Sequence, residues 1–349
     1  MTSGGPLPTT SRAWRLPQVN GHQALKLVED KVPQLESDQV LVKIYAVALN
    51  FHDLHIALGT LRTPPIPNVI PLCDMSGQII ALGSTVKGLK LGDRVSASRV
   101  WDHIHGDFKA HMLPTISGNR CDGMLTEYKV LPVHALVAIP DHLTYEEGAC
   151  LPCSGVTAWT CLHGPRPVKG GDYVLVQGTG GVAVFAIQFA AACGANVIVV
   201  SSSDAKLEVA KSLGAHHLIN YNKTQNWDEE VKRITCGEGV DHIIEIGGPG
   251  TLSRSVKSIS FGGYIHAVGF VNETGGEHID ITRAAMAMAF TVRGIFVGSV
   301  AAFRDMNRLV SSRKLKPVVD KVFRFEEAID AYDYLASQKH IGKVVIKVF

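Results

Sequence analysis

The sequence feature that most constrains the fold is a glycine-rich turn between an apolar strand and an apolar helix. Residues 172–177 predict a short buried strand, residues 178–181 (GTGG) a tight turn, and residues 182–193 a helix. Gly178 permits the turn, Gly180 lets a pyrophosphate approach the backbone, and Ala183 allows close packing of helix on sheet. Free N–H groups at a helix start attract phosphate. The pattern therefore predicts a dinucleotide site that contains Gly178, Thr179, Gly180, Gly181 and Val182.

The rest of the chain divides into two parts that differ in their predicted pattern of strands and helices. After about residue 150, strand-like stretches at 196–200, 217–220, 240–246, 264–268 and 292–297 alternate with helical ones. Such alternation predicts an α/β fold with a doubly wound parallel sheet. Before residue 150, short strands at 39–49 and 69–82 are separated by glycine turns, which is typical of a compact β-barrel-like domain. Residues 99–123 form no regular pattern and predict a long loop.

Composition narrows the classes of function. A chain of 349 residues predicts two domains. Its net charge of +2 provides no basic field for nucleic acid, and no apolar run approaches a membrane span. The seven cysteines are odd in number and scattered, and the first eleven residues do not resemble a signal peptide. We therefore expect a cytoplasmic protein with a small-molecule substrate and neither nucleic-acid nor membrane partners.

The residues after the second strand of the alternating part indicate which nucleotide binds. In NAD-binding proteins this strand usually ends with a carboxylate. This chain has Ser201, Ser202 and Ser203 there, followed by Lys206 in the next helix. Hydroxyl donors and a cation suit a 2′-phosphate, which favours NADP(H) over NAD(H). The alternative is that Asp204 caps the helix and Lys206 is a solvated surface charge.

Seven segments together resemble the medium-chain dehydrogenase/reductase superfamily along nearly the whole chain. They are residues 49–53 (LNFHD), 71–77 (PLCDMSG), 91–95 (LGDRV), 151–159 (LPCSGVTAW), the glycine turn, 211–215 (KSLGA) and 341–346 (IGKVVI). The resemblance implies a GroES-like β-barrel catalytic domain at 1–153 and 298–349 around a Rossmann domain at 154–297. It also implies an active site in the cleft between them and a homodimer formed through the last Rossmann strand, residues 291–297.

The resemblance also bears on metal binding. Zinc alcohol dehydrogenases of this superfamily use cysteine and histidine where this chain has Asn50 and Cys73; Asp74 stands for their glutamate, and Cys153 falls near their third ligand. An amide is a poor zinc ligand. The lobe that holds structural zinc needs four cysteines, and residues 99–123 contain only Cys121. We therefore predict no metal, although the resemblance places Cys73, Asp74, Cys153 and several histidines near one another.

The zinc-free branch that this chain resembles contains quinone oxidoreductases, enoyl reductases and alcohol dehydrogenase-like proteins. It implies catalytic roles for Asn50, as a donor to a carbonyl or carboxamide, and for His52 and His55 as proton sources. Asp53 has a structural role in this pattern, as a helix cap. The implied cofactor contacts outside the glycine turn are Thr157, Ser201, Ser202, Ser203, Lys206, Tyr221, Gly269 and Lys343.

Three functions remain open at this point. The favoured one is an NADP(H)-dependent oxidoreductase that transfers hydride, without zinc, to an activated C=C, a quinone or a carbonyl of a small apolar substrate. The second is an alcohol dehydrogenase or carbonyl reductase. The third is a nucleotide-binding protein without catalysis, since a fold alone does not fix function.

Overall fold

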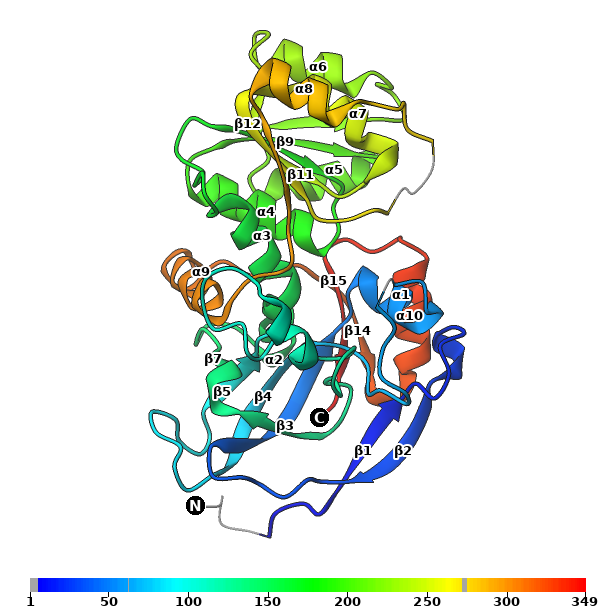
Figure 1. The fold of residues 1–349 in the computed structure, drawn as a ribbon, viewed down its shortest axis with the longest axis vertical. Helices are drawn as coiled ribbons and strands as arrows, with labels where there is room; N and C mark the ends of the chain where they lie inside the picture. Colours follow the sequence, from blue (N-terminus) through cyan, green and yellow to red (C-terminus); the bar gives the residue numbers. More distant parts are fainter. Residues whose placement is uncertain (1–5, 62, 272–274) are drawn as a thin grey trace. The chain divides into compact units, whose positions relative to one another are not determined.

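The computed structural model describes residues 6–61, 63–271 and 275–349, which form two compact units (Figure 1). The first unit contains residues 1–156 and 298–349, and the second contains residues 157–297. The sequence prediction placed the boundaries at 153/154 and 297/298. Each unit is described by itself below.

The first unit is built on a mainly antiparallel seven-stranded sheet. Strand β3 (Gln39–Ala48) lies at its centre, between β4 (Asp74–Leu82) and β15 (Lys343–Lys347), so the two ends of the chain share one sheet. The other strands are β5 (Arg94–Ala97), β6 (Tyr128–Pro132), β7 (Leu136–Ala138) and β14 (Val319–Arg324), and a separate pair contains β1 (Thr10–Arg15) and β2 (Lys26–Lys31). The helices are α1 (Phe51–Leu58), α2 (Tyr145–Ala149), α9 (Val300–Arg313) and α10 (Ala328–Ala336), with a π-helical turn at Leu151–Gly155. Short 3₁₀ turns lie at His22–Ala24, Ala110–Thr115, Val133–Ala135 and Phe325–Glu327.

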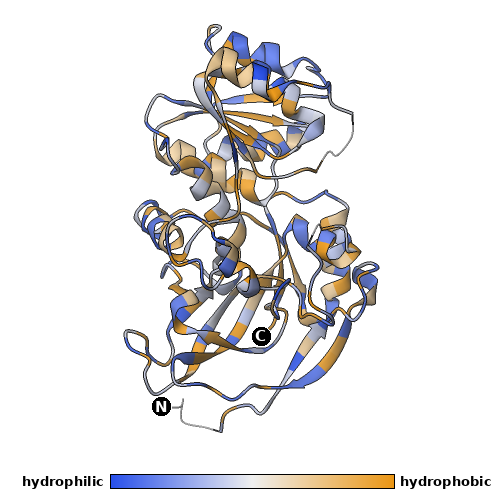
Figure 2. Cartoon of the chain, viewed as in Figure 1, coloured by the Kyte–Doolittle hydropathy of each residue, from blue (hydrophilic) through white to orange (hydrophobic). Residues whose placement is uncertain are grey.

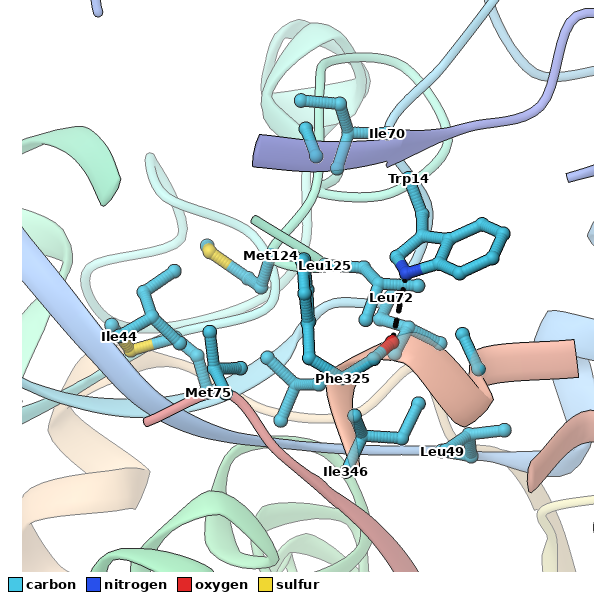
Figure 3. Packing of buried hydrophobic residues seen from close by; sticks show 14 of the residues in the cluster. Trp14, Ile44, Leu49, Ile70, Leu72, Met75, Met124, Leu125, Phe325 and Ile346 are labelled. Atoms are coloured by element: carbon cyan, nitrogen blue, oxygen red, sulfur yellow. Dashed lines mark hydrogen bonds between the residues drawn. The ribbon is translucent and has the colours of Figure 1, made fainter. Parts of the chain in front are cut away.

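A continuous apolar core joins the early and late segments of this unit. Figure 3 shows Ile44, Met75 and Ile346 from β3, β4 and β15 among its buried side chains. The indole N–H of Trp14 donates a 2.9 Å hydrogen bond to the carbonyl oxygen of Phe325, so the only polar atom of that side chain has a partner in the core. Within residues 99–123, Val100, Met112 and Ile116 form a small apolar cluster of their own, whereas Trp101 packs against the main core.

The second unit is a six-stranded parallel sheet in the order β10-β9-β8-β11-β12-β13, with helices packed against its strands (Figure 1). This order is that of the dinucleotide-binding doubly wound fold. The strands are β8 (Tyr173–Gln177), β9 (Asn196–Ser201), β10 (His217–Asn220), β11 (Val240–Glu245), β12 (Ile259–Ala267) and β13 (Thr291–Gly294). The helices are α3 (Val156–Leu162), α4 (Gly181–Ala192), α5 (Asp204–Ser212), α6 (Trp227–Ile234), α7 (Pro249–Ser258) and α8 (Ile281–Met288).

Hydropathy follows these layers. In Figure 2 the strands of the parallel sheet are mainly orange, whereas the helices beside it carry blue segments. Leu175 on β8, Ile198 on β9 and Ile243 on β11 are fully buried in its core. Within the described residues, no helix has both the length and the apolar character needed to cross a membrane.

A buried histidine pair lies in the middle of the parallel sheet. His242 on β11 and His266 on β12 have ring nitrogens 3.2 Å apart and stack with centroids separated by 5.5 Å. Burial, with a smaller contribution from the Arg166 charge, lowers the pKa of His242 to about 4. Burial and the neighbouring His242 lower the pKa of His266 to about 3. Both rings are therefore neutral in the folded protein at neutral pH.

We expect this pair to make the fold sensitive to acid. Each folded-state pKa lies below the usual value of about 6.5, so the stabilisation is present above that pH and is lost as the pH falls toward 4 and 3. At pH 4, keeping one histidine neutral in the folded state lowers the free energy of unfolding by about 3 kcal/mol. In His266→Phe, the free energy of unfolding from urea titrations should therefore fall less between pH 6.5 and pH 4 than in the wild type. The exposed His105 provides a control. His105→Gln should retain the wild-type slope, and an unchanged slope in His266→Phe would contradict the assignment.

Candidate active site

The first cluster of functional side chains begins where β3 ends and α1 begins. Asn50 is the N-cap of α1, with an extended backbone, and its N–H donates to the Asp53 carboxylate at 2.7 Å. In return, the Asp53 N–H donates to the backbone carbonyl of Asn50 at 2.9 Å. Asp53 therefore has the structural role expected of it, and the cap fixes the position of Asn50 at the strand end.

A buried ion pair lies beside Asn50. The Lys343 ammonium, at the start of β15, is 3.0 Å from Oδ2 of Asp74, at the start of β4, and their side chains are 2% and 0% exposed. Lys343 also donates to the carbonyl of Leu49 at 2.7 Å and to Oδ1 of Asn50 at 2.6 Å. Burial alone would lower the pKa of Lys343, but the Asp74 charge and nearby thiols outweigh it and raise that pKa. Three acceptors match the three ammonium hydrogens, so Lys343 holds Asn50 in place, and its predicted contact with the cofactor stays a prediction.

These contacts fix which way the Asn50 amide points. Its Oδ1 accepts from Lys343 and, at 3.0 Å, from the Ser154 hydroxyl in the π-helical turn. Its Nδ2 donates to Asp74 at 3.0 Å and lies 3.9 Å from Sγ of Cys73. A thiol is a weak acceptor, so one of the two Nδ2 hydrogens has no strong protein acceptor. The Cys73 sulfur is therefore the weaker of the two acceptors of the Asn50 amide.

Two thiols and a guanidinium stand next to the amide. Sγ of Cys73, a carboxylate oxygen of Asp74 and Sγ of Cys153 all lie within 4.8 Å of one another, and Nη1 of Arg99 is 4.0 Å from Sγ of Cys153. The contact with Cys153 raises the pKa of Cys73, and burial raises it further. The contact with Cys73 lowers the pKa of Cys153, and the Arg99 charge also lowers it.

This donor set fits a zinc ion poorly. Two thiols and a carboxylate resemble zinc ligands. However, the carboxylate already pairs with the Lys343 ammonium, and the Arg99 guanidinium faces Cys153. Two fixed cations neutralise the anionic donors and would repel a divalent ion. The fourth neighbour is the Asn50 amide, which is a weak ligand.

The two histidine candidates on α1 differ. Nε2 of His52 is 3.2 Å from the Asp53 carboxylate, and burial lowers the pKa of His52 well below its usual value. Burial raises the pKa of Asp53 to about 7, against the opposing hydrogen bond from Asn50. Near neutral pH, Asp53 rather than His52 therefore changes its protonation. His55, half-buried one turn later, has Nδ1 2.8 Å from the Thr60 hydroxyl.

The second cluster surrounds the glycine turn of the parallel sheet. Gly178 has a φ of 75°, and a side chain at Gly178 or Gly180 would meet no atom within 4 Å. Gly180 is the N-cap of the twelve-residue helix α4, which begins at Gly181, continues with Val182, and buries Ala183 against the sheet. Thr179 is buried between the two glycines. Open space in front of free helix N–H groups suits a pyrophosphate, so these residues fit a dinucleotide.

The end of β9 carries the groups predicted to read the ribose. Ser201 ends the strand, Ser202 is exposed, and Ser203 is the N-cap of α5, so Asp204 is its first residue rather than its cap. Lys206 is half-buried in the first turn of α5. Asp204 accepts hydrogen bonds of 2.6 Å from both Asn220 and Lys223.

The remaining cofactor candidates lie elsewhere in the second unit. Tyr221 is 44% exposed, and its N–H bonds to the carbonyl of Ser201, which places it beside the serine run. Thr157 is buried in α3. Gly269 follows β12, where a side chain would approach the carbonyl oxygen of Ile246 to 2.9 Å.

Sequence reasoning missed four side chains. Ser154 orients the amide, Arg99 faces the thiols, and Lys223 neutralises Asp204. The fourth, Glu245 on β11, is 1% exposed and accepts from Gln177 at 2.7 Å and from the N–H of Gly248 at 2.9 Å, which fixes the loop after β11. For Glu245 the available signal was a charged residue at the end of an apolar strand.

Comparison with known proteins identifies the family. Residues 36–141 match the alcohol dehydrogenase GroES-like domain, and residues 181–312 match the zinc-binding dehydrogenase domain. A zinc-type alcohol dehydrogenase-like protein of Schizosaccharomyces pombe is 45% identical over 339 residues, 95% of this chain and 97% of that protein. The chain belongs to the medium-chain dehydrogenase/reductase superfamily. The resemblance and the fold class inferred from the sequence are thus confirmed.

Two further relatives show the range of activities within this superfamily. The NADPH-dependent alkenal/one oxidoreductase of Arabidopsis thaliana chloroplasts is 30% identical, over 99% of this chain and 82% of that one. The crystal structure of an NAD-dependent alcohol dehydrogenase superposes with a TM-score of 0.87 at 31% identity, over 97% of this chain and all of that one. This member of the superfamily is therefore an oxidoreductase that uses a nicotinamide nucleotide.

Proposed function

We propose that this protein uses NADPH to reduce an activated C=C bond or a quinone of a small apolar substrate, without zinc. The observation that carries the proposal is the buried contact of Lys343 with Asp74 and Asn50, which puts a fixed cation and an oriented amide next to the thiols. The relative that acts on alkenals and alkenones with NADPH supports the substrate class.

The chain's own residues account for charge stabilisation. The bound nicotinamide supplies the hydride. Asn50 would then donate Nδ2–H to the oxygen on which negative charge develops, with Lys343 and Ser154 holding its Oδ1 in place. A neutral donor stabilises less charge than a metal ion does. An enolate or hydroquinone anion spreads its charge over several atoms, so it requires less from the site than a simple alkoxide does.

Proton delivery involves the start of α1. His55 is the candidate donor among the two predicted histidines, because the lowered pKa of His52 leaves it neutral. The Asp53 carboxyl, with its pKa raised to about 7, is a second candidate and touches His52 at 3.2 Å.

A second candidate function is alcohol oxidation or carbonyl reduction. Similarity to the Schizosaccharomyces pombe protein and to the NAD-dependent alcohol dehydrogenase favours it. A screen of enones, quinones, aldehydes and alcohols, each with NADPH and NADH or their oxidised forms, separates the two. We expect turnover of enones or quinones with NADPH. Turnover of alcohols alone would contradict the proposal, and no turnover at all would favour a nucleotide-binding protein without catalysis.

We expect Lys206 to select NADPH. A charge-assisted hydrogen bond to phosphate is worth about 1.5–3 kcal/mol, or about ten- to a hundredfold in affinity. Lys206→Ala should weaken NADPH binding by this factor and leave NADH binding nearly unchanged, as measured by fluorescence titration. The exposed Lys211 lies later in the same helix, and Lys211→Ala is the matched control. Equal losses for both cofactors would mean that Lys206 is only a surface charge.

We also propose a cytoplasmic homodimer that pairs through β13. This strand ends at Gly294 rather than at the predicted residue 297, where Val297 has a positive φ of 50°. It lies at the end of the sheet order and exposes Val292 by 39%. All seven cysteines are free, which fits a reducing compartment. Light scattering should give twice the chain mass, and Val292→Lys should shift it to one chain mass. A monomeric wild type at micromolar concentration would contradict this.

A further inference from the structure

Two cysteine thiols lie near each other in the first unit, but they are not the two of the C-x-x-C. Cys150 and Cys153 form the chain's C-x-x-C, yet Sγ of Cys150 donates to the carbonyl of Glu146 at 3.2 Å, back along its own helix. Cys153 instead has Sγ within 4.8 Å of Sγ of Cys73, eighty positions away. The π-helical turn, which contains Cys153, lies directly after Cys150.

The two thiols of this pair have different surroundings. Cys153 is 7% exposed and faces Arg99, whose Nη1 lies 4.0 Å from its sulfur, whereas Cys73 is fully buried. The Cys73 contact and the Arg99 charge lower the pKa of Cys153. Burial raises the pKa of Cys121, Cys150 and Cys161 to about 12 each. The Cys153 thiol is therefore easier to deprotonate than those three thiols, and the thiolate is the form that reacts with a small oxidant.

We infer that Cys73 and Cys153 are a modification site for hydrogen peroxide, which oxidises them to a disulfide. The Cys153 thiolate attacks the peroxide; an S–O bond forms, the O–O bond breaks, and the leaving hydroxide takes a proton to give water. The Cys73 sulfur then attacks the sulfenic sulfur; an S–S bond forms, the S–O bond breaks, and the second hydroxide takes the Cys73 proton. Two thiols are oxidised and one peroxide is reduced to two waters.

Formation of the disulfide requires the two sulfur atoms to approach from within 4.8 Å to about 2 Å. Cys73 directly precedes β4, and Cys153 lies in the π-helical turn, so neither is in the middle of a sheet or a regular α-helix. Sγ of Cys73 lies 3.9 Å from the Asn50 amide nitrogen and 3.8 Å from Oδ1 of Asp74, which connects the thiol pair to the proposed active site.

The test measures peptide masses by mass spectrometry and does not require the proposed oxidoreductase activity. The purified full chain is treated with hydrogen peroxide, blocked with N-ethylmaleimide and digested without reduction. We expect a pair of peptides crosslinked through Cys73 and Cys153. Its mass should be two hydrogen atoms below the sum of the two free-thiol peptides, and a thiol reductant should separate the pair. Cys153→Ser and Cys73→Ser should both abolish the crosslink, and Cys73→Ser should retain a dimedone-reactive sulfenic acid on Cys153.

Cys150→Ser is the matched control, because it removes the neighbouring thiol of the C-x-x-C. It should retain the crosslink. A crosslink that disappears in Cys150→Ser and persists in Cys73→Ser would overturn the inference. So would sulfinic acid on Cys153 in the wild type without any crosslink, or one zinc per chain, by elemental analysis, that protects both thiols.

Discussion

Replacing Lys343 by methionine should lower the free energy of unfolding by about 3–5 kcal/mol, the usual cost of breaking a buried ion pair. The substitution keeps most of the side-chain volume but leaves the Asp74 carboxylate, which is 0% exposed, without its cation. It also removes a donor from Oδ1 of Asn50 and from the carbonyl of Leu49. Urea unfolding at pH 7, followed by fluorescence, measures the change.

Two further variants make this result specific. Lys257→Met breaks a 2.7 Å ion pair with Glu277 on the surface, where the side chains are 51% and 66% exposed, and should leave the unfolding transition nearly unchanged. Lys343→Met combined with Asp74→Asn removes both charges and should recover much of the loss. A Lys343→Met protein as stable as the wild type would mean that water reaches Asp74.

Replacing Asn50 by alanine should lower kcat by about 10²–10³, the usual effect of losing one oxyanion-type donor. The cofactor contacts of the second unit are untouched, so the affinity for NADPH should stay the same. Because Lys343 also loses an acceptor, the unfolding transition must be measured on the same sample. A kcat within threefold of the wild type, with an intact fold, would show that Asn50 does not stabilise the developing charge.

The same assay separates charge stabilisation from proton delivery. Removal of a general acid typically costs about 10²–10⁴ in rate. His55→Ala should show a loss in this range, whereas His52→Ala should show a small one, because its pKa is lowered well below the working range. If both variants retain full kcat from pH 6 to pH 9, neither histidine is the acid, and the Asp53 carboxyl becomes the candidate.

Much of the fold could be predicted because its signals are local. The glycine turn and the alternation of apolar strands and helices identified the parallel sheet, and β10 has the bounds that were predicted. The errors have tertiary causes. Residues 69–82 read as one strand, but β4 begins only at Asp74. Leu72 has a φ of 66°, and the carbonyl of Ile70 bonds to Gly123 instead of to a strand neighbour.

The active site was harder to predict because its contacts are not local. Asn50 was recognised from its motif, but its orientation depends on Lys343, 293 positions later, and on a hydroxyl in a π-helical turn. No periodicity in the sequence marks a π-helix. Lys343 looked like a flanking charge or a cofactor contact, because nothing near it in the sequence shows that Asp74 is its partner.

The contact between Lys343 and Asp74 spans 269 positions, and this has a consequence for how the protein is made. A ribosome releases Asp74 long before Lys343, while residues 157–297 form one contiguous stretch. Domains generally fold as units during synthesis. The nucleotide-binding unit can therefore fold on the growing chain. Asp74 and Asn50, in contrast, gain their partner Lys343 only after β15, near the end of the chain, has been made. We therefore expect the proposed reaction site to be completed last, so that the ability to bind cofactor precedes catalytic competence in a newly made chain.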